Sequence, residues 1–236
     1  MAELRNDVPE EEQIEAISRW WKEKGLSTVV QVLAVAALYF GWQAWQNQQQ
    51  QTAEAASVVY QQLLDVSATL EGQPSNDDYA TAAHLVTTLR VDYEDSTYAQ
   101  YAAMISAKHL NNQEKYSDAI QELDWVIASK PEQSILLAAT LRKSRVLSNS
   151  GDNVKALDTL NIKDRGEFAA SFYELEGDLQ FAMGDLAAAK EAYQQAVNNL
   201  AVGGNNPLLT IKLDSLVVTD SPEPVIETVV TETEEP

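Results

Sequence analysis

The sequence predicts an all-α protein in which an N-terminal transmembrane helix precedes a solenoid of helical hairpins. Glycine and proline are scarce, with 9 and 7 among 236 residues, which favours helices over sheets and turns. An apolar run near the N-terminus has the length of a membrane span. Further on, an alanine-centred pattern returns at intervals of 33 to 37 residues, which is typical of stacked helical hairpins.

The apolar run extends from Leu26 to Trp45 and contains no charged residue. A helix of this length covers about 30 Å, the hydrocarbon thickness of a bilayer. Tryptophans, which favour the membrane interface, flank it on both sides: Trp20, Trp21, Trp42 and Trp45. A signal peptide would have a shorter apolar core and a basic leader, and a buried helix rarely carries tryptophans only at its ends. We therefore predict a retained transmembrane helix over residues 26–46.

The lysine and arginine residues closest to this span all lie on its N-terminal side. Arg19, Lys22 and Lys24 precede it directly, whereas the next basic residue is Arg90. Because basic flanks stay in the cytoplasm and acidic residues count for little, residues 1–25 should form a short cytoplasmic segment. The C-terminal part should then lie in the periplasm, as part of a single-pass protein of the bacterial inner membrane.

Three residues of the span are candidate protein-binding positions. Gln31 carries an amide that is costly in lipid unless it hydrogen-bonds a partner helix, or unless it sits near the cytoplasmic end. Ala37 and Gly41 have the four-residue spacing of small residues at close helix contacts. The alternative is that these three residues have no role in protein binding and occur in the span by chance.

Residues 47–218 are predicted to form about four helical hairpins and a capping helix. No proline or glycine occurs between residues 47 and 71, so a helix can continue from the membrane, with a flexible linker at Gln48–Gln51 as the alternative. The repeated alanines are Ala82, Ala119, Ala156 and Ala189, each followed four residues later by Val86, Leu123, Leu160 or Tyr193. Small residues let two helices approach, and the bulky residues fill the space beside them. The expected pairs are 53–71 with 77–92, 96–110 with 114–129, 132–149 with 152–161, and 166–183 with 185–199.

These hairpins resemble the tetratricopeptide repeat. The stretch "KYSDAIQELDWVIASKP" carries Tyr116, Ala119 and Pro131 at that family's spacing, and the last hairpin has Gly177 and Tyr193 at matching positions. An irregular helical bundle with coincidental alanines is the alternative.

The C-terminal part contains two further segments. Asn206 and Pro207 have the order of a helix start, and the short helix that follows is expected to cap the solenoid. Residues 219–236 contain six acidic and no basic residues, which predicts a disordered acidic tail. Its "VIETVV" stretch could instead add a strand on binding.

No catalytic, cofactor-binding or metal-binding constellation is recognisable. The chain has no cysteine and two histidines, His84 and His109, outside any metal-binding spacing. Glu174, Glu176 and Asp178 cluster, but we expect them to point in different directions into solvent. A formal charge of −20 argues against nucleic-acid binding. We therefore predict a protein that is not an enzyme.

Helical solenoids expose a groove that commonly binds a segment of another protein. Three tyrosines near the junction of the first two hairpins, Tyr93, Tyr98 and Tyr101, are candidates to line it. Packing in the core between hairpins is the alternative for these rings.

The order of these parts resembles the YfgM family of inner-membrane proteins over about residues 9–218. The leader "EEQIEAISRWWKEKG", the exit "GWQAWQ" from the span and the final "IKLDSL" carry the resemblance. It implies a non-catalytic ancillary subunit of the SecYEG translocon that associates with a PpiD-like membrane-anchored chaperone. Such a subunit would bind emerging or unfolded proteins and help pass them to periplasmic chaperones. A membrane-tethered scaffold or regulator for envelope assembly or stress signalling is the alternative.

Overall fold

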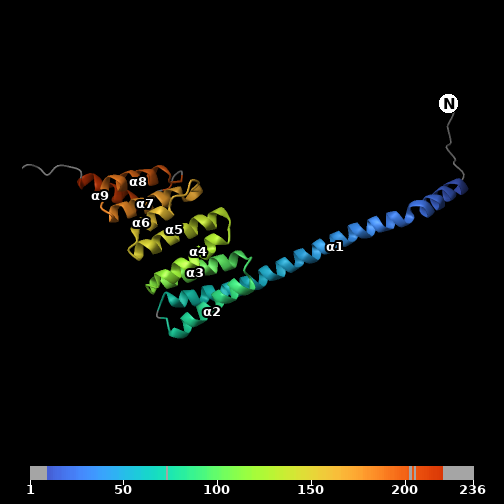
Figure 1. Ribbon diagram of the computed structural model, residues 1–236, viewed down its shortest axis with the longest axis horizontal. Helices are drawn as coiled ribbons and strands as arrows, with labels where there is room; N and C mark the ends of the chain where they lie inside the picture. The colour runs from blue at the N-terminus through green and yellow to red at the C-terminus, as the bar shows by residue number, and fades with distance from the viewer. Residues whose placement is uncertain (1–9, 73, 202–203, 205, 220–236) are drawn as a thin grey trace, which may run out of the picture. The chain divides into compact units, whose positions relative to one another are not determined.

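The computed structural model describes residues 10–72, 74–201, 204 and 206–219, and all regular structure among them is helical. The chain divides into two compact units, residues 1–57 and 58–236. Its elements, labelled in Figure 1, are α1 Glu10–Leu70, α2 Asn76–Asp92, α3 Thr97–Asn112, α4 Tyr116–Ala128, α5 Gln133–Asn149, α6 Asn153–Thr159, the 3₁₀ helix η1 Gly166–Phe168, α7 Ala169–Ala182, α8 Leu186–Asn198 and α9 Pro207–Thr219. The predicted all-α fold is thus confirmed. The predicted acidic tail lies outside the described residues except for Thr219.

Within the first unit, the described chain is part of α1. Among the described residues, this is the one helix long and apolar enough to cross a membrane. Its large apolar side chains are exposed on all sides, with Leu26 82 % and Leu38 75 % accessible. A helix that is apolar all round needs an apolar surrounding, which fits the predicted span. Gln48–Gln51 belongs to the same helix, so the linker alternative is wrong.

The second unit consists of helical hairpins packed in chain order (Figure 1). The hairpins α3–α4, α5–α6 and α7–α8 follow the end of α1 and α2. All four repeated alanines and their bulky partners are buried: Ala82, Val86, Ala119, Leu123, Ala156, Leu160, Ala189 and Tyr193. Since these positions form the contacts between paired helices, the predicted solenoid is confirmed.

Polar side chains cap several of these helices. Ser75 forms a capping box with Asp78 ahead of α2, and Asp152 accepts a hydrogen bond from the backbone N–H of Lys155 at the start of α6. The turn before α8 places Gly184 at a φ of +85°, a region that favours glycine. One boundary differs from expectation, because residues 166–168 form a 3₁₀ turn and α7 begins at Ala169.

The last helix, α9, packs against α8. Leu209 and Leu216 of α9 are buried together with Ala189, Tyr193 and Ala196 of α8. This apolar contact covers the side of the last hairpin that has no following repeat. Terminal repeats need such a cover because each repeat buries its faces only against its neighbours.

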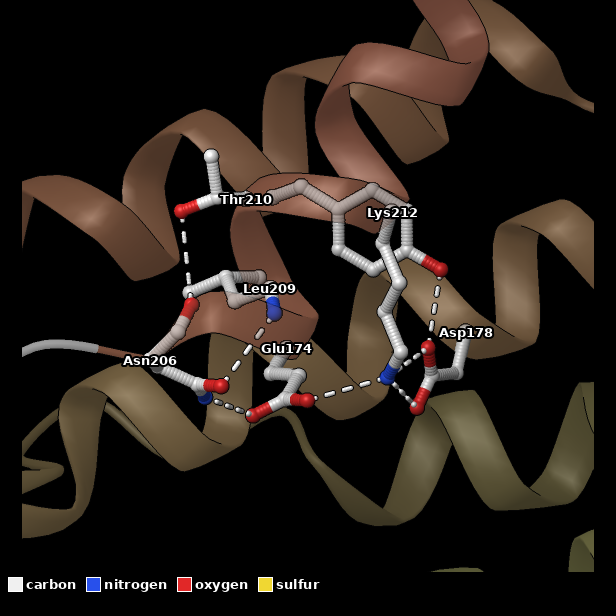
Figure 2. Close-up of polar contacts among 7 residues, drawn as sticks. Glu174, Asp178, Asn206, Leu209, Thr210 and Lys212 are labelled. Carbon is white, nitrogen blue, oxygen red and sulfur yellow. Dashed lines mark hydrogen bonds and ion pairs between the residues drawn. The ribbon is translucent and has the colours of Figure 1, made fainter.

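Acidic residues of α7 hold α9 in place (Figure 2). The ammonium group of Lys212 donates to Glu174 Oε1 and Asp178 Oδ2, both at 2.9 Å. Asn206 Nδ2 also donates to Glu174 Oε2, at 3.3 Å. Burial alone would lower the pKa of Lys212, but its bonds to Asp178 and Glu174 outweigh burial and raise that pKa.

These contacts correct our expectation that the acidic cluster of α7 is merely solvated. Glu174 and Asp178 are four residues apart and share one face of the helix, which is the face that receives Lys212. Glu176 points elsewhere and forms an ion pair with Arg165. The partner of each acid comes from another part of the chain, so the spacing within α7 could not identify it.

Candidate functional site

Three tyrosine rings gather where the end of α1 meets α3. The ring of Tyr60 lies 5.3 Å from that of Tyr98 and 6.2 Å from that of Tyr101, between centroids. Tyr60 and Tyr98 are half-buried, whereas Tyr101 is 37 % exposed. Partial burial, and then Tyr101, raises the pKa of the Tyr60 hydroxyl. The Tyr60 hydroxyl is therefore neutral at physiological pH, and the cluster is amphipathic and open to solvent on one side.

This cluster borders a groove formed by the first helices of successive hairpins. We define the groove by the residues of two adjoining hollows that share Met104, Ile105 and Arg142. Its principal lining residues are Tyr60, Tyr101, Met104, Ile105, Lys108, Ala138, Arg142, Arg145 and Phe168. The hollows have volumes of about 270 and 290 Å³, just below the range of about 300–1,000 Å³ typical of small-molecule sites. Such shallow hollows suit individual side chains of a bound polypeptide.

Two arginines of α5 supply the charge of the groove. Arg142 and Arg145 are exposed, and no described carboxylate lies within the 4.0 Å ion-pair distance of either. Desolvation by the groove walls lowers the pKa of Arg142, and the neighbouring charge of Arg145 lowers it further. The Arg142 guanidinium group still carries its charge at neutral pH. The groove thus presents two cations in a chain whose net charge is −20.

The two ends of the groove differ in charge. Beyond Phe168, a third hollow is lined by Asp164 and Glu167. At the opposite end, Asn149 Nδ2 donates to Asn111 Oδ1 at 2.9 Å and so connects α5 to α3. A segment bound along the groove would therefore meet cations in the middle and carboxylates beside Phe168.

The structure brings together only some of the residues predicted as sites. Tyr98 and Tyr101 lie in the ring cluster, but Tyr93 is the C-cap residue of α2 and belongs to neither the cluster nor the groove lining. The groove also contains Tyr60, Arg142 and Arg145, which we did not predict as site residues. Tyr60 recurs with Ala56, Leu63 and Leu70 at intervals of three to seven residues, a helical periodicity that was a usable signal for it, whereas nothing local marks the arginines.

The predicted membrane contacts all lie on α1. Gln31, Ala37 and Gly41 are exposed, and a Cβ added at Gly41 would meet nothing within 4 Å. Their role as protein-binding positions remains a prediction.

The described residues offer little for catalysis. No group of three or more histidine, aspartate or glutamate side chains among them is placed to hold a metal ion. His109 Nε2 and Ser67 Oγ are 2.6 Å apart, and both side chains are buried. This pair joins α1 to α3 as part of the core.

Comparison with known proteins places the whole described solenoid in one family. The model of the tetratricopeptide repeat-like domain matches residues 18–218. A Haemophilus influenzae protein named "Ancillary SecYEG translocon subunit" is 29 % identical over 80 % of this chain and 89 % of its own. An Escherichia coli protein of the same name is 26 % identical over 89 % of this chain and 97 % of its own.

A solved structure is also similar, a tetratricopeptide repeat protein from Parabacteroides merdae. It covers 69 % of this chain and 57 % of its own, with 15 % identity and a TM-score of 0.48. The predicted YfgM resemblance is confirmed by relatives that match most of the length of this chain. Because the family model matches residues 18–218, this chain belongs to the tetratricopeptide repeat-like domain family.

Proposed function

We propose that this protein is a non-catalytic ancillary subunit of the SecYEG translocon that binds other proteins through its helical-repeat unit. The observation that carries the proposal is the open groove in which Tyr101 and two arginines, neither ion-paired with a described carboxylate, are exposed to solvent. Exposed aromatic and arginine side chains are enriched where proteins bind one another. The names of the relatives supply the translocon as the assembly.

The topology belongs to the same proposal. The span over residues 26–46 anchors the chain in the inner membrane, residues 1–25 stay in the cytoplasm, and residues 47–218 are periplasmic. The basic residues before the span support this orientation. The groove then lies on the side where secreted chains emerge, and a PpiD-like chaperone and emerging chains are its expected partners. In this role the protein helps pass emerging chains to periplasmic chaperones.

Site-specific photo-crosslinking in intact membranes tests the proposal. A crosslinker at position 101 in the groove should trap an emerging chain or a chaperone, and one at position 31 or 41 should trap a translocon subunit. Position 154 is the matched control, because Val154 is 71 % exposed but lies on α6, away from the groove lining. Equal crosslinking from positions 101 and 154 would contradict a binding groove.

The orientation needs its own experiment. Protease added to spheroplasts should digest the repeat unit, whereas inverted vesicles should protect it. The opposite pattern would reverse the topology. Crosslinks from positions 31 and 41 to division or outer-membrane factors alone would favour the second candidate, a membrane-tethered scaffold or regulator for envelope assembly or stress signalling.

A further inference from the structure

We infer that the groove selects partner segments that carry acidic side chains next to aromatic or apolar ones. This inference rests on the proposed protein-binding function and specifies the chemistry of the partner. The inference is based on the proximity of Arg142 and Arg145 to the ring cluster of Tyr60, Tyr98 and Tyr101 in one groove.

The charge of the groove is opposite to that of the chain. The chain has 36 acidic and 16 basic residues, yet no aspartate or glutamate lines the two hollows that define the groove. Acidic residues elsewhere on the surface repel an acidic segment, so the arginine pair is a local exception. Opposite charges across an interface favour the correct partner and disfavour others.

Several other basic residues of the repeat unit are already paired with carboxylates. Lys143 lies 2.6 Å from Asp124, and Arg90 lies 2.9 Å from Glu122. Lys108, which also lines the groove, is paired with Glu71. Arg142 and Arg145 have no such described partner, and they stand three residues apart on one face of α5. Their mutual repulsion falls when a carboxylate binds between them.

An arginine guanidinium group binds a carboxylate more specifically than a lysine ammonium group does, since it can donate two parallel hydrogen bonds to the two carboxylate oxygens. Tyr60 and Tyr101 of the ring cluster line the same hollow as Arg142, and Arg145 lines the adjoining hollow that also contains Arg142. A segment with an acidic residue beside an aromatic one can therefore satisfy both features at once. Asp164 and Glu167 beyond Phe168 disfavour acidic residues at that end, so the groove also selects the direction of the segment.

Fluorescence polarisation with a matched peptide set tests the inference. The full-length protein in nanodiscs is titrated against three labelled peptides that share two aromatic residues and differ only in a central Glu-Glu, Gln-Gln or Lys-Lys pair. We expect the Glu-Glu peptide to bind about tenfold more tightly than the Gln-Gln peptide, the gain from one charge-assisted hydrogen-bonded pair. The Lys-Lys peptide should bind most weakly, and added salt should reduce the difference.

Charge reversal separates the arginine pair from the net charge of the protein. The double variant Arg142→Glu/Arg145→Glu should bind the Lys-Lys peptide best. The control Lys155→Glu/Lys163→Glu changes the net charge equally at exposed positions outside the groove lining and should keep the wild-type order. Circular dichroism should show that both variants are folded, because all four side chains are exposed.

The outcomes distinguish this inference from the proposed function. If all three peptides bind equally and Tyr101→Ala weakens each of them, the groove binds proteins but the charge selection is wrong. If no peptide binds, both the groove function and the charge selection are overturned. If the control double variant reverses the order as well, the net charge of the chain is responsible and the inference fails.

Discussion

The two units of this chain use apolar residues in opposite ways. In the first unit, Leu38 of α1 is 75 % exposed, whereas Leu63 near the end of the same helix is fully buried in the second unit. The first segment is apolar on every side, and the second is apolar on one face that packs against other helices. Whether a leucine of α1 is exposed or buried therefore depends on how apolar residues are distributed around the helix at that point. Within one continuous helix, this contrast separates the apolar candidate membrane span from a segment that packs into the repeat unit.

The largest expected effect comes from placing charge in the anchor. The double variant Val35→Asp/Leu38→Asp puts two carboxylates near the centre of the span, at a cost of about 2.5–3.5 kcal/mol each. After alkaline carbonate extraction the variant should appear in the soluble fraction. Val154→Asp is the control, because Val154 is nearly as exposed as Leu38, at 71 % against 75 %, but belongs to the repeat unit. Retention of the double variant in the membrane would refute the span.

Neighbouring leucines near the end of α1 sharpen the comparison. Leu63→Ala removes a fully buried side chain and should lower the free energy of unfolding of the repeat unit by about 2–5 kcal/mol. Leu64 is 36 % exposed, so Leu64→Ala should cost less than about 1 kcal/mol. Urea unfolding followed by circular dichroism measures both. Similar losses would mean that both side chains contribute equally to the core.

Two glycines offer a matched test of packing. A Cβ at Gly177 would lie 2.4 Å from the ring of Tyr193, whereas a Cβ at Gly41 would meet nothing within 4 Å. We expect Gly177→Ala to lower the free energy of unfolding by about 1–3 kcal/mol through overpacking, and Gly41→Ala to leave it unchanged. Thermal unfolding of the two variants makes the comparison. Tyr193→Leu should relieve part of the Gly177→Ala cost, and a fully additive result would argue against the clash.

The smallest expected effect is a dependence of repeat-unit stability on pH. Burial, with a smaller contribution from Lys108, lowers the pKa of His109 below its usual 6.5, although Glu71 opposes this. The unfolded chain therefore binds a proton first as the pH falls through 6.5. Stability is full above that pH, declines as the pH approaches the lowered pKa of the folded state, and then levels off.

Urea titrations at neutral and mildly acidic pH measure this decline. His109→Gln keeps a hydrogen-bonding side chain beside Ser67 but cannot take up the proton, so its stability should change less over the same range. An equal decline in the wild-type protein and the variant would assign the effect to other groups.

Most of the fold could be predicted because its signals are local. The alanines and bulky residues of each hairpin recur at a fixed spacing, and all of them are buried as expected. The 3₁₀ turn at residues 166–168 was missed, since a short turn of this kind leaves the apolar periodicity intact.

The candidate site was only partly predictable because its members come from different repeats. Tyr98 and Tyr101 were predicted from their place at a junction and their rings lie beside Tyr60, whereas Tyr93, five residues before Tyr98, is the C-cap residue of α2. Tyr60 joins the cluster from α1, which precedes its partners by a whole hairpin.

The sequence alone determined that the chain has an apolar span, a hairpin repeat and an acidic overall charge, because these depend on composition and on spacing along the chain. The tertiary structure decided which charges are paired. It gave Glu174 and Asp178 a partner in Lys212, 34 to 38 residues away, and left Arg142 and Arg145 without a described carboxylate. The physical reason is that ion pairs depend on distance in space, and in a solenoid the stacking of repeats sets that distance.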